Sequence, residues 1–116
     1  MSRRLPAHLE VAALLRLAQE EGGFGVIVSR GERDAGTIAI ITLRRGQNAM
    51  LWERMPALDG KRDFTCIKSQ DAEKPNELTE YISRMSGRDP DLWVVELDVD
   101  NPERFIANRV NGVDLV

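Results

Sequence analysis

Hydrophobic positions in the first half of the chain follow the spacing of β-strands. Three short β-prone runs follow one another, at residues 24–30, 37–43 and 49–54, and residues that favour turns separate them. The middle run is apolar on both faces, which indicates a central strand that is covered from both sides. Because the connections between the runs are short, we expect antiparallel neighbours in meander order.

Strand-like runs also occur in the second half of the chain. Residues 64–68 alternate between apolar and polar side chains and predict a fourth strand. Residues 92–99 predict a fifth strand, which ends before Pro102. A short return strand is expected over residues 103–106, followed by a tail that we expect to be weakly structured after about residue 107.

Two segments have apolar residues at helical spacing. The first helix is expected to begin near Pro6 and to stop at Gly22, and the second to begin after Asp71 or Asn76 and to stop at Gly87. Their apolar stripes are Val11, Leu14, Leu15 and Ala18 in the first, and Leu78, Tyr81, Ile82 and Met85 in the second. The predicted fold is therefore α+β: an antiparallel sheet of four to five strands in meander order, packed against two amphipathic helices.

Length and charge limit the classes of protein that fit this chain. With 116 residues, a single domain over residues 1–116 is expected. The formal net charge of -3 provides no field that would attract nucleic acid or an anionic membrane. No apolar run approaches the roughly 18 residues of a membrane span. Because Cys66 is the single cysteine, no internal disulfide can form, and we expect a cytoplasmic protein without membrane contact.

Metal-binding motifs are missing from the sequence. The single cysteine and the single histidine, His8, lie far apart without the spacing of metal ligands. Glu96, Asp98 and Asp100 alternate and would project from one face of the last strand, but the residues after them do not complete a calcium loop. We interpret them as acidic side chains that keep a strand edge from pairing, and we expect no metal and no cofactor.

Charged residues and an indole gather in two predicted turns. The first turn, between the first two strands, contains Arg30 and Asp34, and the second, before the last strand, contains Arg88, Asp89, Asp91 and Trp93, with Glu96 further along that strand. If the last strand pairs beside the first, these turns meet and form an arginine–carboxylate cluster beside the indole. The alternative is that Asp34 and Asp89 only stabilise their own turns, as turn aspartates often do.

At these residues the sequence resembles a family of small alphaproteobacterial proteins known only as a domain of unknown function. The likeness extends from about Leu9 to Phe105, and its most distinctive segment is Asp89-Pro90-Asp91-Leu92-Trp93-Val94-Val95-Glu96. Further parts are the helix end Glu20-Glu21-Gly22, the motif Val28-Ser29-Arg30-Gly31 with Asp34-Ala35-Gly36, and the helix around Tyr81. Two residues separate Gly31 from Asp34, where the family would have an aspartate nearer the glycine. The resemblance implies a compact cytoplasmic bacterial domain and transfers no catalytic residue.

Three hypotheses about function follow. The leading one is a non-enzymatic binding or assembly module, expected to form a homodimer, with an unknown protein partner as a further option, because a small sheet has exposed edges to bury. Trp52, Trp93 and Met50 are the expected contacts, unless they complete the core of the monomer.

The first alternative is a small enzyme. In that hypothesis Asp34, Asp89, Asp91 or Glu96 acts as an acid or base, and Arg30 or Arg88 holds an anionic substrate. The second alternative is a nucleic-acid-binding accessory protein. Its candidate contacts are Trp52 and six arginines: Arg30, Arg33, Arg44, Arg45, Arg54 and Arg62. Acidic residues are interleaved with those arginines, so paired surface charge is the favoured interpretation and nucleic acid is not an expected partner.

Overall fold

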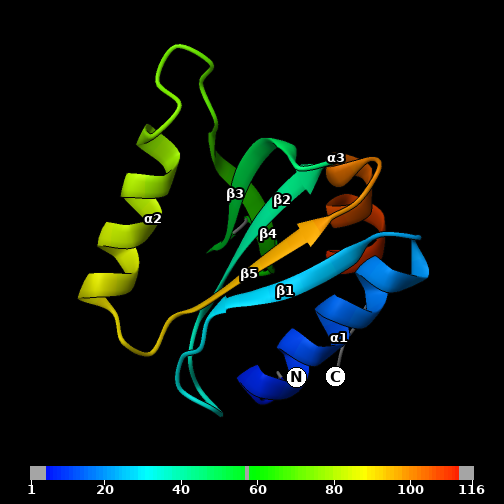
Figure 1. Ribbon diagram of the computed structural model, residues 1–116. Coiled ribbons are helices and arrows are strands. Elements are labelled where there is room, and N and C mark those ends of the chain that lie inside the picture. Colours follow the sequence, from blue (N-terminus) through cyan, green and yellow to red (C-terminus); the bar gives the residue numbers. More distant parts are fainter. Residues whose placement is uncertain (1–4, 57, 113–116) are drawn as a thin grey trace.

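Five strands form one mixed sheet with helices on both of its faces (Figure 1). The computed structural model describes residues 5–56 and 58–112. The strands are β1 (Phe24–Ser29), β2 (Ile38–Arg44), β3 (Gln47–Pro56), β4 (Arg62–Ser69) and β5 (Trp93–Asp98). The helices are α1 (Ala7–Glu20), α2 (Glu77–Arg88) and the short α3 (Pro102–Phe105), which continues into a π-helical turn, η1 (Ile106–Val110). The predicted α+β class and the upper strand number of five are confirmed.

The predicted meander order is wrong for β1 and β5. The strands lie in the order β1-β5-β2-β3-β4, so β5 separates β1 from β2. It pairs antiparallel with β1 and parallel with β2, and only β2, β3 and β4 form a meander. The physical reason is burial: Val94 and Val95 are both fully buried, one on each face of β5, which requires a place inside the sheet. The long connection through α2 lets β5 cross back to that place.

The larger part of the core lies between the sheet and α1. Val11, Leu14 and Ala18 are buried against the side chains of Ile40 and Leu97 on this face. The helical stripe predicted for the first helix therefore packs on the sheet, as its spacing requires. Gly25 allows α1 to lie close to β1, because a Cβ atom there would stand 2.7 Å from the Leu15 side chain.

The second helix lies on the opposite face of the sheet. It begins at Glu77 with Asn76 as N-cap, the later of the two predicted starts, and continues past Gly87 to Arg88. Leu78 is its buried residue, in contact with the cluster that includes Ile41 and Leu51. Because this cluster is drawn from β2, β3 and the first part of β5, α2 covers only part of its face. The two helices thus cover different faces, which the sequence pattern left open.

The C-terminal segment is helical where a return strand was expected. Pro102 begins α3, and the Asn101 side chain accepts a hydrogen bond from the Arg104 N–H at 3.2 Å. The prediction of a weakly structured tail is wrong up to residue 112, because Ile106 and Val110 are buried in the core on the α1 face. Residues 113–116 lie outside the described residues. Among the helices described, none is long and apolar enough to cross a membrane.

Candidate functional site

The two charged turns of the chain are in direct contact. Because β1 and β5 pair antiparallel, the end of β1 lies beside the start of β5. The backbone N–H of Glu32 donates to the Asp91 carbonyl at 3.0 Å, and the Trp93 indole N–H donates to the Glu32 carbonyl at 2.7 Å. Segments about 60 residues apart in the sequence are thus held together by backbone and indole hydrogen bonds.

Two glycines allow this close approach of the backbones. A Cβ atom at Gly31 would lie 2.1 Å from the Asp91 carbonyl oxygen, and one at Gly36 would lie 2.3 Å from the same atom. Neither distance leaves room for a side chain. Glycine at these two positions therefore allows the two turns to pack against each other, in addition to allowing the loop to bend.

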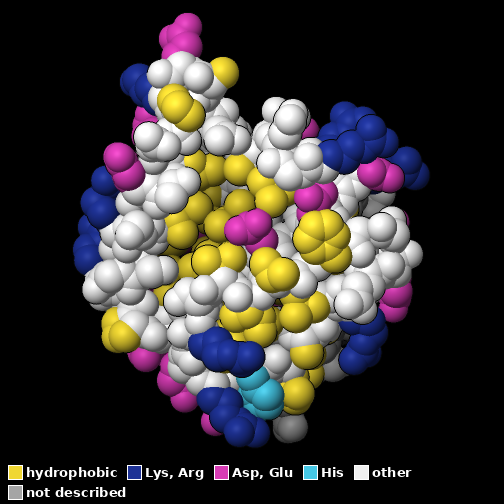
Figure 2. Space-filling model, viewed as in Figure 1, with side chains coloured by type: hydrophobic (Ala, Val, Ile, Leu, Met, Phe, Trp, Pro, Cys, Tyr) yellow, Lys and Arg dark blue, Asp and Glu magenta, His cyan; other side chains and the backbone are white. Residues whose placement is uncertain are grey.

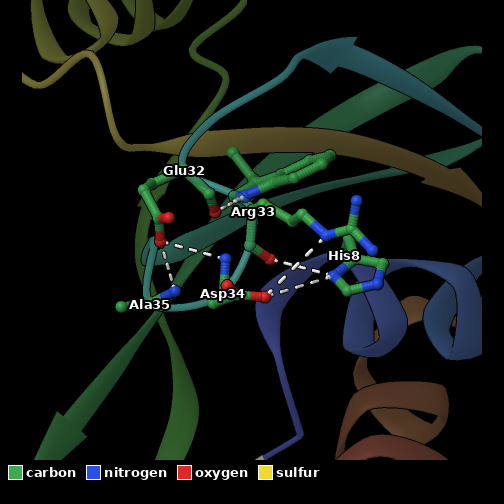
Figure 3. A network of polar contacts seen from close by, with 6 residues as sticks. His8, Glu32, Arg33, Asp34 and Ala35 are labelled. Atoms are coloured by element: carbon green, nitrogen blue, oxygen red, sulfur yellow. Dashed lines mark hydrogen bonds and ion pairs between the residues drawn. The ribbon is translucent and has the colours of Figure 1, made fainter.

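The loop between β1 and β2 also holds the start of α1 (Figure 3). The backbone N–H groups of Ala7 and His8 donate to the carbonyls of Asp34 and Arg33, at 3.0 and 2.9 Å. The His8 Nδ1 atom lies 3.1 Å from the Arg33 carbonyl oxygen and 3.9 Å from the Asp34 carboxylate. The loop thus provides partners for N–H groups that a helix start leaves without intrahelical bonds.

Glu32 stabilises the interior of this loop. Its carboxylate accepts hydrogen bonds from the backbone N–H groups of Asp34, at 3.0 Å, and Ala35. One of the two alternatives for Asp34 was that it stabilises its own turn, but its carboxylate lies 3.9 Å from Arg33 and from His8. Glu32 precedes Asp34 by two residues and Ala35 by three. A side chain at this spacing can accept hydrogen bonds from the backbone N–H groups of a turn, and this pattern was overlooked in the sequence.

The other predicted members of the cluster have separate roles. The Asp89 carboxylate accepts from the Asp91 N–H at 3.0 Å, so it stabilises its own turn, as the alternative interpretation stated. The Arg30 guanidinium lies 6.0 Å from the centre of the Trp93 ring, within the range of a cation–π contact. Arg88 is exposed at the end of α2. The turns therefore meet without pairing Arg30 or Arg88 with the aspartates.

We call the loop at residues 30–36 and the turn at residues 88–93, which contact each other, the joined turns. The Glu32 and Asp89 carboxylates accept hydrogen bonds from backbone N–H groups, so both stabilise these turns. A recess of about 440 Å³ lies elsewhere, between the end of α1 and the start of α3, where Arg109 is paired with Glu20 and Glu21. Within residues 5–56 and 58–112, no group of three or more potential ligands is placed to hold a metal ion.

The expected dimer contacts through the two tryptophans are wrong. Trp52 is 7% exposed and donates its indole N–H to the Thr42 hydroxyl at 2.8 Å, and Trp93 is 4% exposed. Met50 packs partly buried against the same core. These side chains complete the core of the monomer, which was the alternative. With Trp52 buried, it also cannot stack on a nucleotide base.

Three exposed apolar side chains lie together on the edge strand β1. Phe24, Val26 and Val28 are 59%, 47% and 51% exposed. Phe24 pairs with Asp98 and Val26 with Glu96, so these side chains share the face of the sheet that α2 covers only in part. We call Phe24, Val26, Val28 and Glu96 the open strip. Figure 2 shows hydrophobic side chains gathered in a hollow beside α2 on this side of the molecule, with an acidic side chain among them.

Two acidic residues of β5 on this face, Asp98 and Glu96, differ in their hydrogen-bond partners. The Asp98 carboxylate accepts from the N–H groups of Arg45 and Gly46, both at 2.8 Å, and so fixes the turn between β2 and β3. Both turn residues have positive φ, as a two-residue hairpin turn requires. Glu96 is half-buried and makes no side-chain hydrogen bond or ion pair with any described residue. Of these two residues, Glu96 is therefore the one whose carboxylate is available to a partner.

A third acidic residue, Glu53 in β3, is partly buried, and this burial should make the stability of the protein depend on pH. Burial raises the pKa of Glu53 above its ordinary value of 4.5. Because the folded state favours the protonated form, stability is lost as the pH rises from the unfolded pKa through the raised folded pKa. We expect Glu53→Gln to raise the melting temperature at pH 7 and to leave it unchanged near pH 3. Thermal unfolding followed by circular dichroism checks this, with the exposed Glu73→Gln as control. An equal shift in both variants would contradict it.

Comparisons with known proteins place this fold in a family. A model of the family DUF1491, described as a protein of unknown function, matches residues 5–107. The crystal structure of a DUF1491 family protein from Caulobacter crescentus CB15 has 30% sequence identity and a TM-score of 0.73, and the match covers 84% of this chain and 91% of that chain. The solution structure of protein Atu0922 from A. tumefaciens has 27% identity and a TM-score of 0.69, over 85% and 89% of the two chains. No curated protein matches. The chain belongs to the DUF1491 family, whose function is unknown.

Proposed function

We propose that this protein is a non-enzymatic binding or assembly module that acts through the open strip. The observation that carries the proposal is the exposure of three large apolar side chains, Phe24, Val26 and Val28, along one edge strand. Fully burying a side chain of this kind contributes about 1.5–3 kcal/mol. About half of each of these side chains remains exposed after folding. A partner that covers the strip would bury that remaining surface and gain the corresponding free energy.

The joined turns support an enzyme less well than a scaffold. Their glycines and hydrogen bonds fix the contact of β1 with β5, and this contact sets the row of side chains that forms the open strip. Arg30, one of the two arginines expected to hold a substrate, lies against the Trp93 ring, 6.0 Å from its centre. The turns are therefore best explained as the support of a binding surface.

The homodimer expected from the sequence belongs to this proposal. The outer edge of β1 is free, since β1 pairs only with β5 among the described strands. Such an edge can accept a strand of a second copy. The register shift between Ile27 and Ser29 limits that pairing to the first part of β1. A bacterial cytoplasm is the proposed setting, supported by the relatives from Caulobacter crescentus CB15 and A. tumefaciens.

Site-specific cross-linking tests the proposal. A photo-activated amino acid at position 26 is expected to give discrete adducts in cells, because Val26 lies in the open strip. The same group at Arg16, exposed on α1 at the opposite face, is the matched control and should give none.

The mass of the adduct and sedimentation of the purified protein at micromolar concentration separate the two kinds of partner. A doubled mass and a sedimenting dimer would support the homodimer, whereas a clean monomer would remove it. Identical adduct patterns from positions 26 and 16, or none from either, would overturn the binding function itself.

A further inference from the structure

We infer that the open strip binds a basic amphipathic helix of another protein, which lies on the sheet beside α2. This inference rests on the proposed binding function and identifies the partner's chemistry. Three observations carry it: the uncovered width of the sheet, a Glu96 carboxylate with no partner among the described residues, and the poor fit of a second copy to the same face.

The uncovered part of the face has the width of one helix. The buried cluster under α2 takes its residues from β2, β3 and the first half of β5, which leaves β1 and the second half of β5 open. Neighbouring strands are about 4.8 Å apart, so two strands offer a surface about 10 Å wide. A helix with its side chains is about 10–12 Å in diameter. One helix would complete the layer that α2 begins.

The charge of the strip selects a cationic partner. Glu96 stands directly opposite Val26 in the ladder between β5 and β1, so a carboxylate lies among apolar side chains. It is half-buried and has no ion pair within the described residues, while the neighbouring Asp98 is occupied by two backbone N–H groups. A Lys or Arg between apolar residues of a docking helix would pair with Glu96 as those residues cover Phe24 and Val26.

A second copy fits this face less well. Stacking two open strips about a two-fold axis would bring the two Glu96 carboxylates to one apolar interface with no cation from the strip itself. Each chain also carries a net charge of -3. A homodimer through the strand edge would leave the face free, so edge pairing and helix docking are separate events.

Chemical-shift mapping with a model peptide tests the inference. The probe is an amphipathic helical peptide of leucine and lysine, added to the isotope-labelled protein, and the comparison peptide has glutamate in place of lysine. We expect the lysine peptide to shift the amide resonances of Phe24, Val26 and Glu96, with binding at least about tenfold tighter than that of the glutamate peptide.

Three variants separate specific docking from general attraction. Val26→Asp should weaken the lysine peptide by about tenfold or more, and Glu96→Gln by about fivefold. Glu103→Gln, which removes the same charge from an exposed position in α3, should change binding less than twofold. If Val26→Asp does not fold, Val26→Thr keeps the branched shape and should still weaken binding.

Equal losses from Glu96→Gln and Glu103→Gln, or shifts spread over the whole surface, would overturn the inference. Tighter binding of the glutamate peptide would overturn it too. Each of these results would leave the proposed binding function standing if position 26 still cross-links to a partner. Failure of both the peptide and the cross-link would remove both proposals.

Discussion

Replacing Arg54 with methionine is expected to lower the free energy of unfolding by about 3–5 kcal/mol. Glu10, in α1, is 2% exposed, and its carboxylate accepts a hydrogen bond from the Arg54 guanidinium of β3. The same guanidinium lies 4.5 Å from the centre of the Phe64 ring. Without Arg54, a buried carboxylate would lose its cation, which is the costly way to disrupt a buried ion pair. Chemical denaturation measures the change.

The double variant Glu10→Met with Arg54→Met provides the decisive comparison. Removing both charges and filling the space with apolar side chains should return the free energy of unfolding to within about 1 kcal/mol of the original protein. Arg16→Met, an exposed arginine of α1, should change it by about 0.5 kcal/mol or less. A double variant as unstable as Arg54→Met alone would show that the charges do not act as a pair.

Alanine at Gly31 is expected to destabilise the protein by about 3 kcal/mol, with a melting temperature lower by roughly 10 °C or more. The new Cβ would stand 2.1 Å from the Asp91 carbonyl oxygen and 2.6 Å from the Leu92 carbonyl carbon. Both are backbone atoms that cannot turn away as a flexible side chain would. To relieve the overlap, the loop must separate from the start of β5, which breaks the hydrogen bond from Glu32 to Asp91. Thermal unfolding measures the effect.

Gly87→Ala is the matched control for Gly31→Ala. Gly87 lies inside α2, and a Cβ atom there would meet no other atom within 4 Å. Because alanine favours the helix more than glycine does, this change should stabilise the protein by about 0.5–1 kcal/mol. The same chemical substitution thus has opposite expected signs at the two positions. A small effect at Gly31 would show that the joined turns separate easily.

Local patterns were a good guide to the elements of this fold. The spacing of Val11, Leu14 and Ala18 predicted a helix that packs by one face, and the structure has it. The return strand over residues 103–106 was wrong because Pro102 and the capping Asn101 begin a helix there. Pro102 thus ends the region of β5 and also begins α3. The four residues 103–106 are too few for their apolar and polar pattern to distinguish a strand from a helix.

The candidate site was predicted less well than the elements. Trp93 and the two turns were named as the candidate site, but Glu32 was not, and His8 was considered only as a metal ligand; both hold the loop in place. Both side chains bind backbone N–H or carbonyl groups. Nearly every residue has these groups, so the sequence does not show which of them will be the partner. The open strip was missed for a related reason: the valines of β1 look like core residues until the strand is known to lie at the edge.

Side-chain periodicity was enough to predict the type and approximate limits of five strands and two amphipathic helices, because it reports which faces of an element are apolar. The insertion of β5 between β1 and β2, the placement of the helices on opposite faces and the position of Glu96 beside exposed valines follow from the folded arrangement alone. The spacing of apolar residues indicates that one face of a helix or strand must be buried, but it does not indicate which segment covers that face. That choice depends on how all the apolar faces of the chain are covered at once.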